Sequence, residues 1–189
     1  MNRDNIITLP NKHLRQRSKK VFEFNNHLHK LIENMKSATI DWEDHRNHEI
    51  GVALAAPQID VLERAIIVRD NLENKDDKGF TALINPSIVK KLGEPVEDFE
   101  GCLSVCDLYG KVPRYPKVKV EASTLDGKKV RLTAEGFLAR IFQHEIDHLN
   151  GIVFIDHIKD RDAFYQLSPE GELIKVDHNE IIKSDILWN

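Results

Sequence analysis

The sequence has few of the features that would direct a protein to a membrane, to an oxidising compartment or to nucleic acid. Its 189 residues include only two cysteines, too few for the disulfide framework of a small secreted protein. No stretch reaches the roughly 20 apolar residues that a membrane-spanning helix needs, and the N-terminal segment lacks the apolar core of a secretory signal. Lysine and arginine number 27 against 31 aspartate and glutamate, so no basic excess indicates nucleic-acid binding. We expect a cytoplasmic protein.

The spacing of apolar residues predicts a first helix near the N-terminus. In residues 24–36, leucine, isoleucine and methionine recur at helical intervals, and Asn25 or Asn26 can serve as the N-cap. Residues 37–49 are polar and irregular. We therefore expect an amphipathic helix that is followed by a long surface loop.

Several segments further along the chain predict antiparallel strands. Residues 64–70 and 81–89 are rich in β-branched side chains, and residues 118–124 and 128–133 flank an Asp-Gly pair that favours a tight hairpin turn. The C-terminal extension, residues 158–189, predicts a further hairpin with its turn at Pro169, Glu170 and Gly171, followed by a tail.

A second helix is predicted to begin after Thr133 as N-cap and to end at Asn150 and Gly151. It is apolar most of the way round, so we expect it to be central and buried. The predicted fold is α+β, with antiparallel sheets surrounding a central buried helix that carries the motif HEIDH. Residues 1–189 are expected to form a single catalytic domain.

The segment QHEIDH, residues 143–148, contains the residues best suited to chemistry. Residues four apart share a helix face, so His144 and His148 can direct ring nitrogens at one atom, with Glu145 about 100° around the helix. These polar residues could stand there by chance. However, two histidines and a glutamate in a buried, apolar helix are costly without a partner. The pattern therefore predicts a divalent metal site.

A catalytic metal site generally has three protein ligands and an open position, so a third ligand is needed. A common extension of the motif requires histidine where Phe154 stands, and Glu170 and Glu172 flank a turn that should be exposed. Cys102, in EGCLSV, is the better candidate because a thiolate is a strong, soft ligand. Cys102 could instead be a small buried apolar residue, and Cys106 competes for the same role.

Three motifs together resemble the peptide deformylase family: GVALAAPQ at residues 51–58, EGCLS at residues 100–104 and QHEIDH. The resemblance covers about residues 6–157. It implies a hydrolase that removes the formyl group from N-formyl-methionyl peptides and releases formate. It also implies that Cys102, His144 and His148 bind one divalent metal ion per chain, Fe(II) in the cell, with zinc, nickel or cobalt as alternatives. Glu145 would be the general acid and base.

The resemblance also implies roles for residues around the metal. The Gln58 side-chain amide and the Leu103 backbone N–H would stabilise the oxyanion. Glu100 and Arg114 would form a pair that braces the metal ligands. The small residues of GVALAAPQ leave a strand edge for an extended peptide to pair with. The expected substrate-binding residues are Gly51, Val52, Ala53, Phe137, Arg140 and Ile141.

Two positions depart from the family pattern. Ala53 stands in place of a glycine, which would strain the chain if that position requires a positive φ and would only narrow the pocket if it requires room. Cys106 stands where proline is common, and we interpret it as a spare thiol rather than a ligand. His45 and His48 lie in a hydrophilic segment and are expected to be exposed.

The expected partners are N-formyl-methionyl nascent peptides and, near its exit tunnel, the ribosome; the chain is expected to be a monomer. Two other functions remain open from the residues alone. One is a His-Glu-x-x-His metallopeptidase that cuts internal peptide bonds. The other is a metal-stabilised binding module without catalysis, against which Glu145 argues, because a structural site needs no base.

Overall fold

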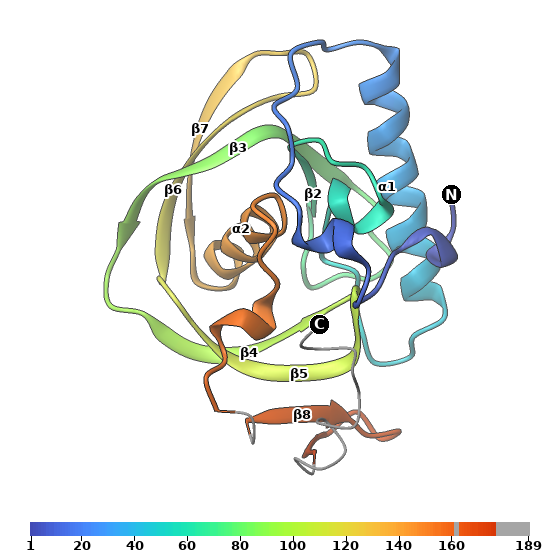
Figure 1. Ribbon diagram of the computed structural model, residues 1–189, viewed down its shortest axis with the longest axis vertical. Coiled ribbons are helices and arrows are strands. Elements are labelled where there is room, and N and C mark those ends of the chain that lie inside the picture. The colour runs from blue at the N-terminus through green and yellow to red at the C-terminus, as the bar shows by residue number, and fades with distance from the viewer. Residues whose placement is uncertain (161–162, 177–189) are drawn as a thin grey trace.

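Antiparallel strands and two α-helices form the part of the chain that the computed structural model describes, residues 1–160 and 163–176 (Figure 1). The helices are α1 (Asn26–Asp44) and α2 (Gly136–His148). The strands are β1 (Ala53–Ala55), β2 (Ala65–Arg69), β3 (Phe80–Leu92), β4 (Val96–Cys102), β5 (Val105–Arg114), β6 (Lys117–Ser123), β7 (Lys129–Glu135), β8 (Phe164–Leu167) and β9 (Leu173–Lys175). Short 3-10 helices are η1 (Arg3–Asn5), η2 (Lys12–Arg15), η3 (Ala56–Ile59) and η4 (Phe154–His157).

The strands form two sheets. One has the order β1-β2-β3-β6-β7 and the other β4-β5-β8-β9, and every neighbouring pair whose register is given is antiparallel. The antiparallel sheets are therefore confirmed. Helix α2 contacts strands of the first sheet and β5 of the second, and Figure 1 shows it between them. No helix in the described ranges is long and apolar enough to cross a membrane.

The burial of α2 follows from its sequence. Phe142, Ile146 and Leu149 are at most 5% exposed and pack against the apolar face of the first sheet. Each fully buried side chain of this size contributes about 1.5–3 kcal/mol relative to exposure. The polar residues His144, Glu145 and His148 are buried in the same helix. The helix thus carries its reactive side chains into the interior.

Helix α1 begins where predicted, with Asn25 as N-cap, but it is longer than predicted. The expected surface loop at residues 37–49 is wrong up to Asp44, because the helix continues and buries Ala38, Thr39 and Glu43. The sequence is misleading here because a carboxylate normally indicates exposure. Glu43 is buried because it has a buried cationic partner, Arg69 of β2.

The predicted start of α2 is also wrong. Strand β7 continues through Thr133 to Glu135, and the helix follows at Gly136, whose φ of 58° permits the abrupt change of direction. At the other end, Gly151 has a φ of 77°, and a Cβ there would lie 2.6 Å from the Arg15 carbonyl oxygen. The predicted glycine stop is therefore confirmed.

The hairpins β2–β3, β6–β7 and β8–β9 match the predicted pairs of strands. Strands β4 and β5 were not predicted, because their sequences, VEDFEGC and VCDLYGKVPR, combine charged residues with glycine and proline and show no clean alternation. They nevertheless form the longest run of paired residues in the second sheet, and the EGCLS motif lies at the end of β4 and in the turn to β5. The predicted tail beyond residue 176 lies outside the described residues.

Candidate metal centre and active site

Side chains from β4 and α2 meet at one point. Cys102 is the last residue of β4, and His144 and His148 lie one turn apart on α2. One ligand atom from each of the three lies within 4.8 Å of the others, and Cys102 Sγ is 3.2 Å from His148 Nε2. A thiolate and two imidazoles, with room for a further ligand, are the donors of a catalytic transition-metal site. The chemistry of the site therefore fits a divalent ion.

Glu100 sets the orientation of His144. The His144 Nδ1–H donates to Glu100 Oε2 at 3.0 Å, which leaves Nε2 to face the cluster. Burial alone would lower the pKa of His144, but its hydrogen bonds with Cys102 and Glu100 raise it well above its ordinary value. Burial lowers the pKa of His148, which favours the neutral, ligating form of that ring.

Glu100 is itself held by two arginines. Arg114 donates from both Nε and a terminal nitrogen, at 2.9 and 3.0 Å, and Arg140 donates at 2.8 Å. Burial alone would raise the pKa of Glu100, but the hydrogen bonds from His144 and Arg114 lower it far below its ordinary value. The pair of Glu100 and Arg114 is therefore a buried brace behind a histidine rather than a surface ion pair.

Arg114 also connects Glu100 to Asp147, which lies within the HEIDH motif. Arg114 also donates to Asp147 Oδ2 at 2.5 Å, and His157 Nε2–H donates to the same oxygen at 2.8 Å. Arg114 therefore connects Glu100, which orients His144, with Asp147 on α2, whereas His148 Nδ1 itself has no hydrogen-bond partner in the described part of the chain. A chain of charge-assisted bonds of this kind restricts the helix to one orientation against β4 and β5.

Glu145 is a buried carboxyl beside the cluster. It is 4% exposed, and its Oε2 has no hydrogen-bond partner within the described part of the chain. Burial raises the pKa of Glu145 to about 7, although the nearby charge of His144 opposes this. A carboxyl with a pKa near neutrality can both accept and return a proton. An unpartnered buried oxygen is also what a general base presents before substrate binds.

Gln58 comes to the site from η3, directly after β1. Its Oε1 accepts from the Ala55 N–H at 2.8 Å, which fixes the orientation of the amide. Its Nε2 therefore faces the site, 3.2 Å from Ser104 Oγ and 3.5 Å from Cys102 Sγ. Leu103 lies in the turn between β4 and β5, beside Cys102. Sequence reasoning did not single out Ser104, although it belongs to the EGCLS motif.

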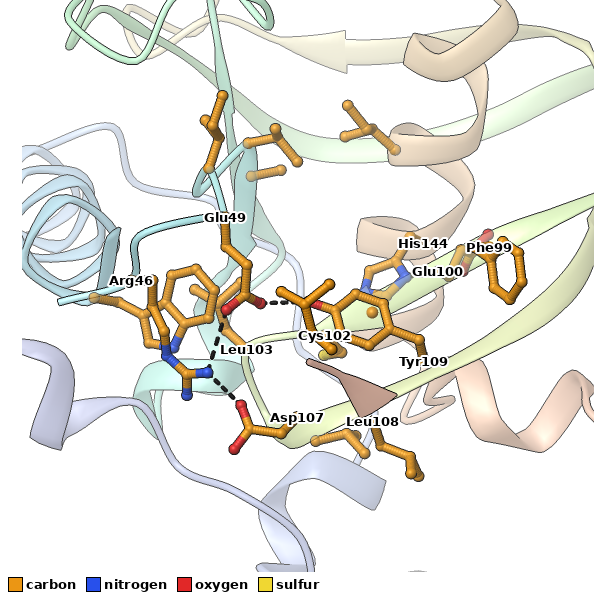
Figure 2. Close-up of a pocket in the computed structure, with 18 of the residues that line it drawn as sticks. Arg46, Glu49, Phe99, Glu100, Cys102, Leu103, Asp107, Leu108, Tyr109 and His144 are labelled. Carbon is orange, nitrogen blue, oxygen red and sulfur yellow. Dashed lines mark hydrogen bonds and ion pairs between the residues drawn. The ribbon is translucent and has the colours of Figure 1, made fainter. Parts of the chain in front are cut away.

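A cavity of about 430 Å³ opens onto these residues (Figure 2). Its volume is in the range of ligand-binding pockets. Its lining includes Gln58, Glu100, Cys102, Leu103, His144 and Glu145 of the cluster and its surroundings, and also Val52, Ala53, Phe137, Arg140 and Ile141. Gly51 is the expected substrate-binding residue that the cavity lining does not include.

Three of the expected pocket residues have particular surroundings. Gly51 is buried, and a Cβ there would lie 2.5 Å from the Thr39 side chain, which is a packing reason for glycine. Ala53 is not among the residues with positive φ, so of the two alternatives for this position backbone strain is excluded and a narrower pocket remains. The Arg140 guanidinium donates to Glu100 and to the carbonyls of Val96, Asp98 and Val112, so it braces the wall instead of lying free at a rim.

The other ligand candidates lie elsewhere. Phe154 is 1% exposed and its ring stacks beside His144 at a centroid distance of 6.2 Å. Glu170 and Glu172 are exposed next to the β8–β9 turn and do not belong to the cluster. The side chain of Cys106 lies outside the described part of the structure. His45 and His48 are exposed, as predicted.

Comparison with known proteins gives one family. The family model for polypeptide deformylase matches residues 3–164. A peptide deformylase of Thermomicrobium roseum is 41% identical over 170 residues, covering 88% of this chain and 92% of the relative. A peptide deformylase of Halothermothrix orenii is 46% identical over 145 residues, covering 77% of this chain and 86% of the relative.

Solved structures agree with the sequence relatives. A peptide deformylase from Legionella pneumophila superposes with a TM-score of 0.72 at 40% identity, covering 82% of this chain and 85% of that one. A peptide deformylase from Synechococcus elongatus in complex with actinonin has a TM-score of 0.74 at 35% identity, covering 82% of this chain and 80% of that one.

Proposed function

The chain belongs to the polypeptide deformylase family, and from that premise we propose that Cys102, His144 and His148 hold one divalent metal ion and that Glu145 moves the protons of the reaction. The enzyme removes the formyl group from N-formyl-methionyl peptides and releases formate. The observation that supports this assignment is the convergence of one thiol and two imidazoles within 4.8 Å, beside a buried carboxyl oxygen without a partner in the described residues.

We propose Fe(II) as the ion in the cell. The same donor atoms also suit zinc, nickel and cobalt, because a mixed set of sulfur and nitrogen ligands does not discriminate strongly among these ions. When bound, such an ion supplies a Lewis acid and makes water more acidic. The Glu100 brace supports this role, since it fixes which nitrogen of His144 is available.

Glu145 carries the proton from the attacking water to the leaving group. As the water oxygen forms its bond to the formyl carbon, Glu145 Oε2 accepts the proton that the water loses. When the carbon–nitrogen bond breaks, Glu145 returns that proton to the amine of the new N-terminus. A single carboxyl can perform both transfers because its pKa is raised to about 7 by burial.

Gln58 and Leu103 stabilise the negative charge that develops on the formyl oxygen. The Gln58 Nε2 already faces the Cys102 side of the cavity, and its amide is fixed through Ala55 before substrate arrives. Leu103 offers a backbone N–H from the turn that follows Cys102. Donors fixed in advance cost no reorganisation when the charge appears.

The substrate is proposed to lie along β1 as an additional strand. β1 is at one end of its sheet, paired only with β2 in the described part of the chain, so its other edge, apart from the Ala55 N–H that Gln58 Oε1 accepts from, can offer main-chain hydrogen bonds. The methionine side chain would be enclosed by Val52, Phe137 and Ile141, which line the cavity. Main-chain recognition suits a substrate whose later sequence varies.

We also propose the domain organisation, the cellular location and the partners of the enzyme. Helix α2 with its HEIDH motif is the central helix around which the sheets are built, and residues 1–189 form one catalytic domain whose C-terminal extension begins near residue 158. We propose that the enzyme acts in the cytoplasm as a monomer on nascent peptides as they leave the ribosomal exit tunnel. The substrate supports this setting, because formylated N-termini belong to newly made chains.

Formate release under anaerobic conditions tests the assignment. We expect formate from formyl-Met-Ala-Ser and no cleavage of casein. Cleavage of casein would support a metallopeptidase, and neither activity with metal bound would support a binding module. Metal analysis of the same sample separates a lost activity from a lost ion.

A further inference from the structure

The cavity extends well beyond the residues that perform the chemistry. Its lining also includes Leu167, Gly171 and Leu173, which belong to the β8–β9 hairpin or its turn. The match to the family model ends at residue 164, the first residue of β8. The hairpin therefore adds a wall to the catalytic cavity from a part of the chain that the family model does not describe.

Strand register places the two leucines on one face. Leu167 and Leu173 are directly opposite each other across β8 and β9, and Tyr165 is opposite Tyr109 of β5. Since side chains alternate along a strand, Tyr165 and Leu167 point to the same side. That side is the one on which Tyr109 lines the cavity. The leucines therefore lie on the same face of this sheet as Tyr109.

The hairpin is held in a defined position. Phe164 is fully buried, and the Tyr165 ring meets Phe99 of β4 edge-on at a centroid distance of 4.9 Å. At the turn, His48 Nε2–H donates to the Pro169 carbonyl at 3.1 Å. The hairpin is therefore attached at its base to β5 and at its turn to His48, which also lines the cavity.

The charged groups at this mouth are paired with one another. Figure 2 shows Glu49 accepting from the Tyr109 hydroxyl and from Arg46, and Arg46 also pairing with Asp107. Arg46 lies over the Trp42 ring at 5.0 Å from its centroid. Arg46 is thus engaged by two carboxylates and is not free to select an acidic substrate residue. The leucines add apolar surface to the same cavity.

We propose that Leu167 and Leu173 bind the apolar side chain of the second or third residue of the formyl peptide and so determine substrate preference beyond methionine. This rests on the proposed function. The occupant is the substrate because one and the same cavity is lined by Cys102 and Glu145 and by the two leucines. An extended peptide advances about 3.3 Å per residue, so the residues that follow methionine lie in the part of the cavity away from the reacting formyl group, where further lining residues can contact them.

Competing peptides test the proposal. We would measure kcat/KM of the metal-loaded enzyme for formyl-Met-Leu-Leu and formyl-Met-Ser-Ser, in the wild type and in the double variant Leu167→Ser/Leu173→Ser. The wild type should prefer the apolar peptide, and the double variant should lower that ratio roughly fivefold, as expected for two half-buried leucine contacts. Ile174→Ser is the matched control, since Ile174 is on the same hairpin, 57% exposed, and points to the other face.

The outcomes separate this inference from the proposed function. A ratio that is unchanged in the double variant, or that falls equally in Ile174→Ser, would overturn the role of the leucines while leaving deformylation intact. Absence of formate from both peptides in the wild type would overturn the proposed function and the inference with it. If the double variant does not fold, the single variants decide, each with a ratio about twofold lower than in the wild type.

Discussion

Glu100→Gln is the substitution that should weaken both the fold and the metal site. In the structure, donors from Arg114, Arg140 and His144 converge on the Glu100 carboxylate. A glutamine has nearly the same shape but only one acceptor oxygen, and its NH₂ group would face donors. The substitution therefore removes the negative charge of the carboxylate and places the amide hydrogens of glutamine opposite the N–H donors, with little change in the shape of the side chain.

The expected cost follows from burial. Glu100 and Arg114 are 6% and 5% exposed, so the arginine would keep its charge in the interior without its main partner. Removing one partner of a buried ion pair typically costs about 3–5 kcal/mol of unfolding free energy. Losing the carboxylate that orients a metal-binding histidine typically lowers metal affinity about 10- to 100-fold.

Urea unfolding of chelator-treated protein measures the loss of unfolding free energy, and zinc competition with a chromophoric chelator measures the loss of metal affinity. Glu97→Gln is the matched control on the same strand, because Glu97 is exposed; it should change stability by at most about 0.5 kcal/mol. A Glu100→Gln variant that loses less than about 1 kcal/mol and keeps wild-type zinc affinity would refute the reasoning, because the buried pair would then not behave as buried pairs do.

Other substitutions test separate parts of the account. Gln58→Leu should lower turnover about 100- to 1,000-fold and keep the metal, and full activity would exclude Gln58 as an oxyanion donor. Cys102→Ala should lose the metal during gel filtration in chelator, and one retained ion per chain would mean that the ligand set is wrong. Glu43→Gln should cost about 3–5 kcal/mol in urea unfolding, because Arg69, whose side chain is fully buried with that of Glu43, would lose its charge partner. An unchanged midpoint would show that the Glu43–Arg69 pair contributes nothing measurable to stability, contrary to what its burial predicts.

The local patterns that could be predicted are those in which sequence and environment agree. The hairpins with β-branched strands and an Asp-Gly turn, the Asn25 N-cap and the Gly151 stop all depend on short-range preferences. The buried apolar faces of α1 and α2 follow in the same way from helical periodicity.

The parts that could not be predicted depend on partners far away in the sequence. The length of α1 depends on Glu43, whose carboxylate accepts from Arg69 on β2 at 2.5 Å and from the Gly51 N–H at 2.9 Å. No local pattern shows that such a pair will be buried. Strands β4 and β5 likewise gain their stability from pairing with each other and not from alternation.

In the site too, some features follow from local sequence and others depend on residues far apart in the chain. The spacing of His144 and His148 is enough to place both on one helix face, because helix geometry is local. The double role of Arg114, which connects Glu100 to Asp147, needs β4, β5 and α2 to be packed together first. The extension of the cavity over Leu167 and Leu173 depends on the pairing of β8 with β5, which the sequence does not display.

The most direct test of the account compares wild type with Glu145→Gln, both purified without oxygen. Metal per chain and formate release from formyl-Met-Ala-Ser are measured on the same samples. We expect one ion per chain in both proteins and a loss of at least about 100-fold in formate release in the variant, because the proton carrier is gone and the ligands remain. A variant that keeps the ion and the wild-type rate would contradict the role of Glu145, and a variant that loses the ion would show that Glu145 holds the metal instead of moving protons.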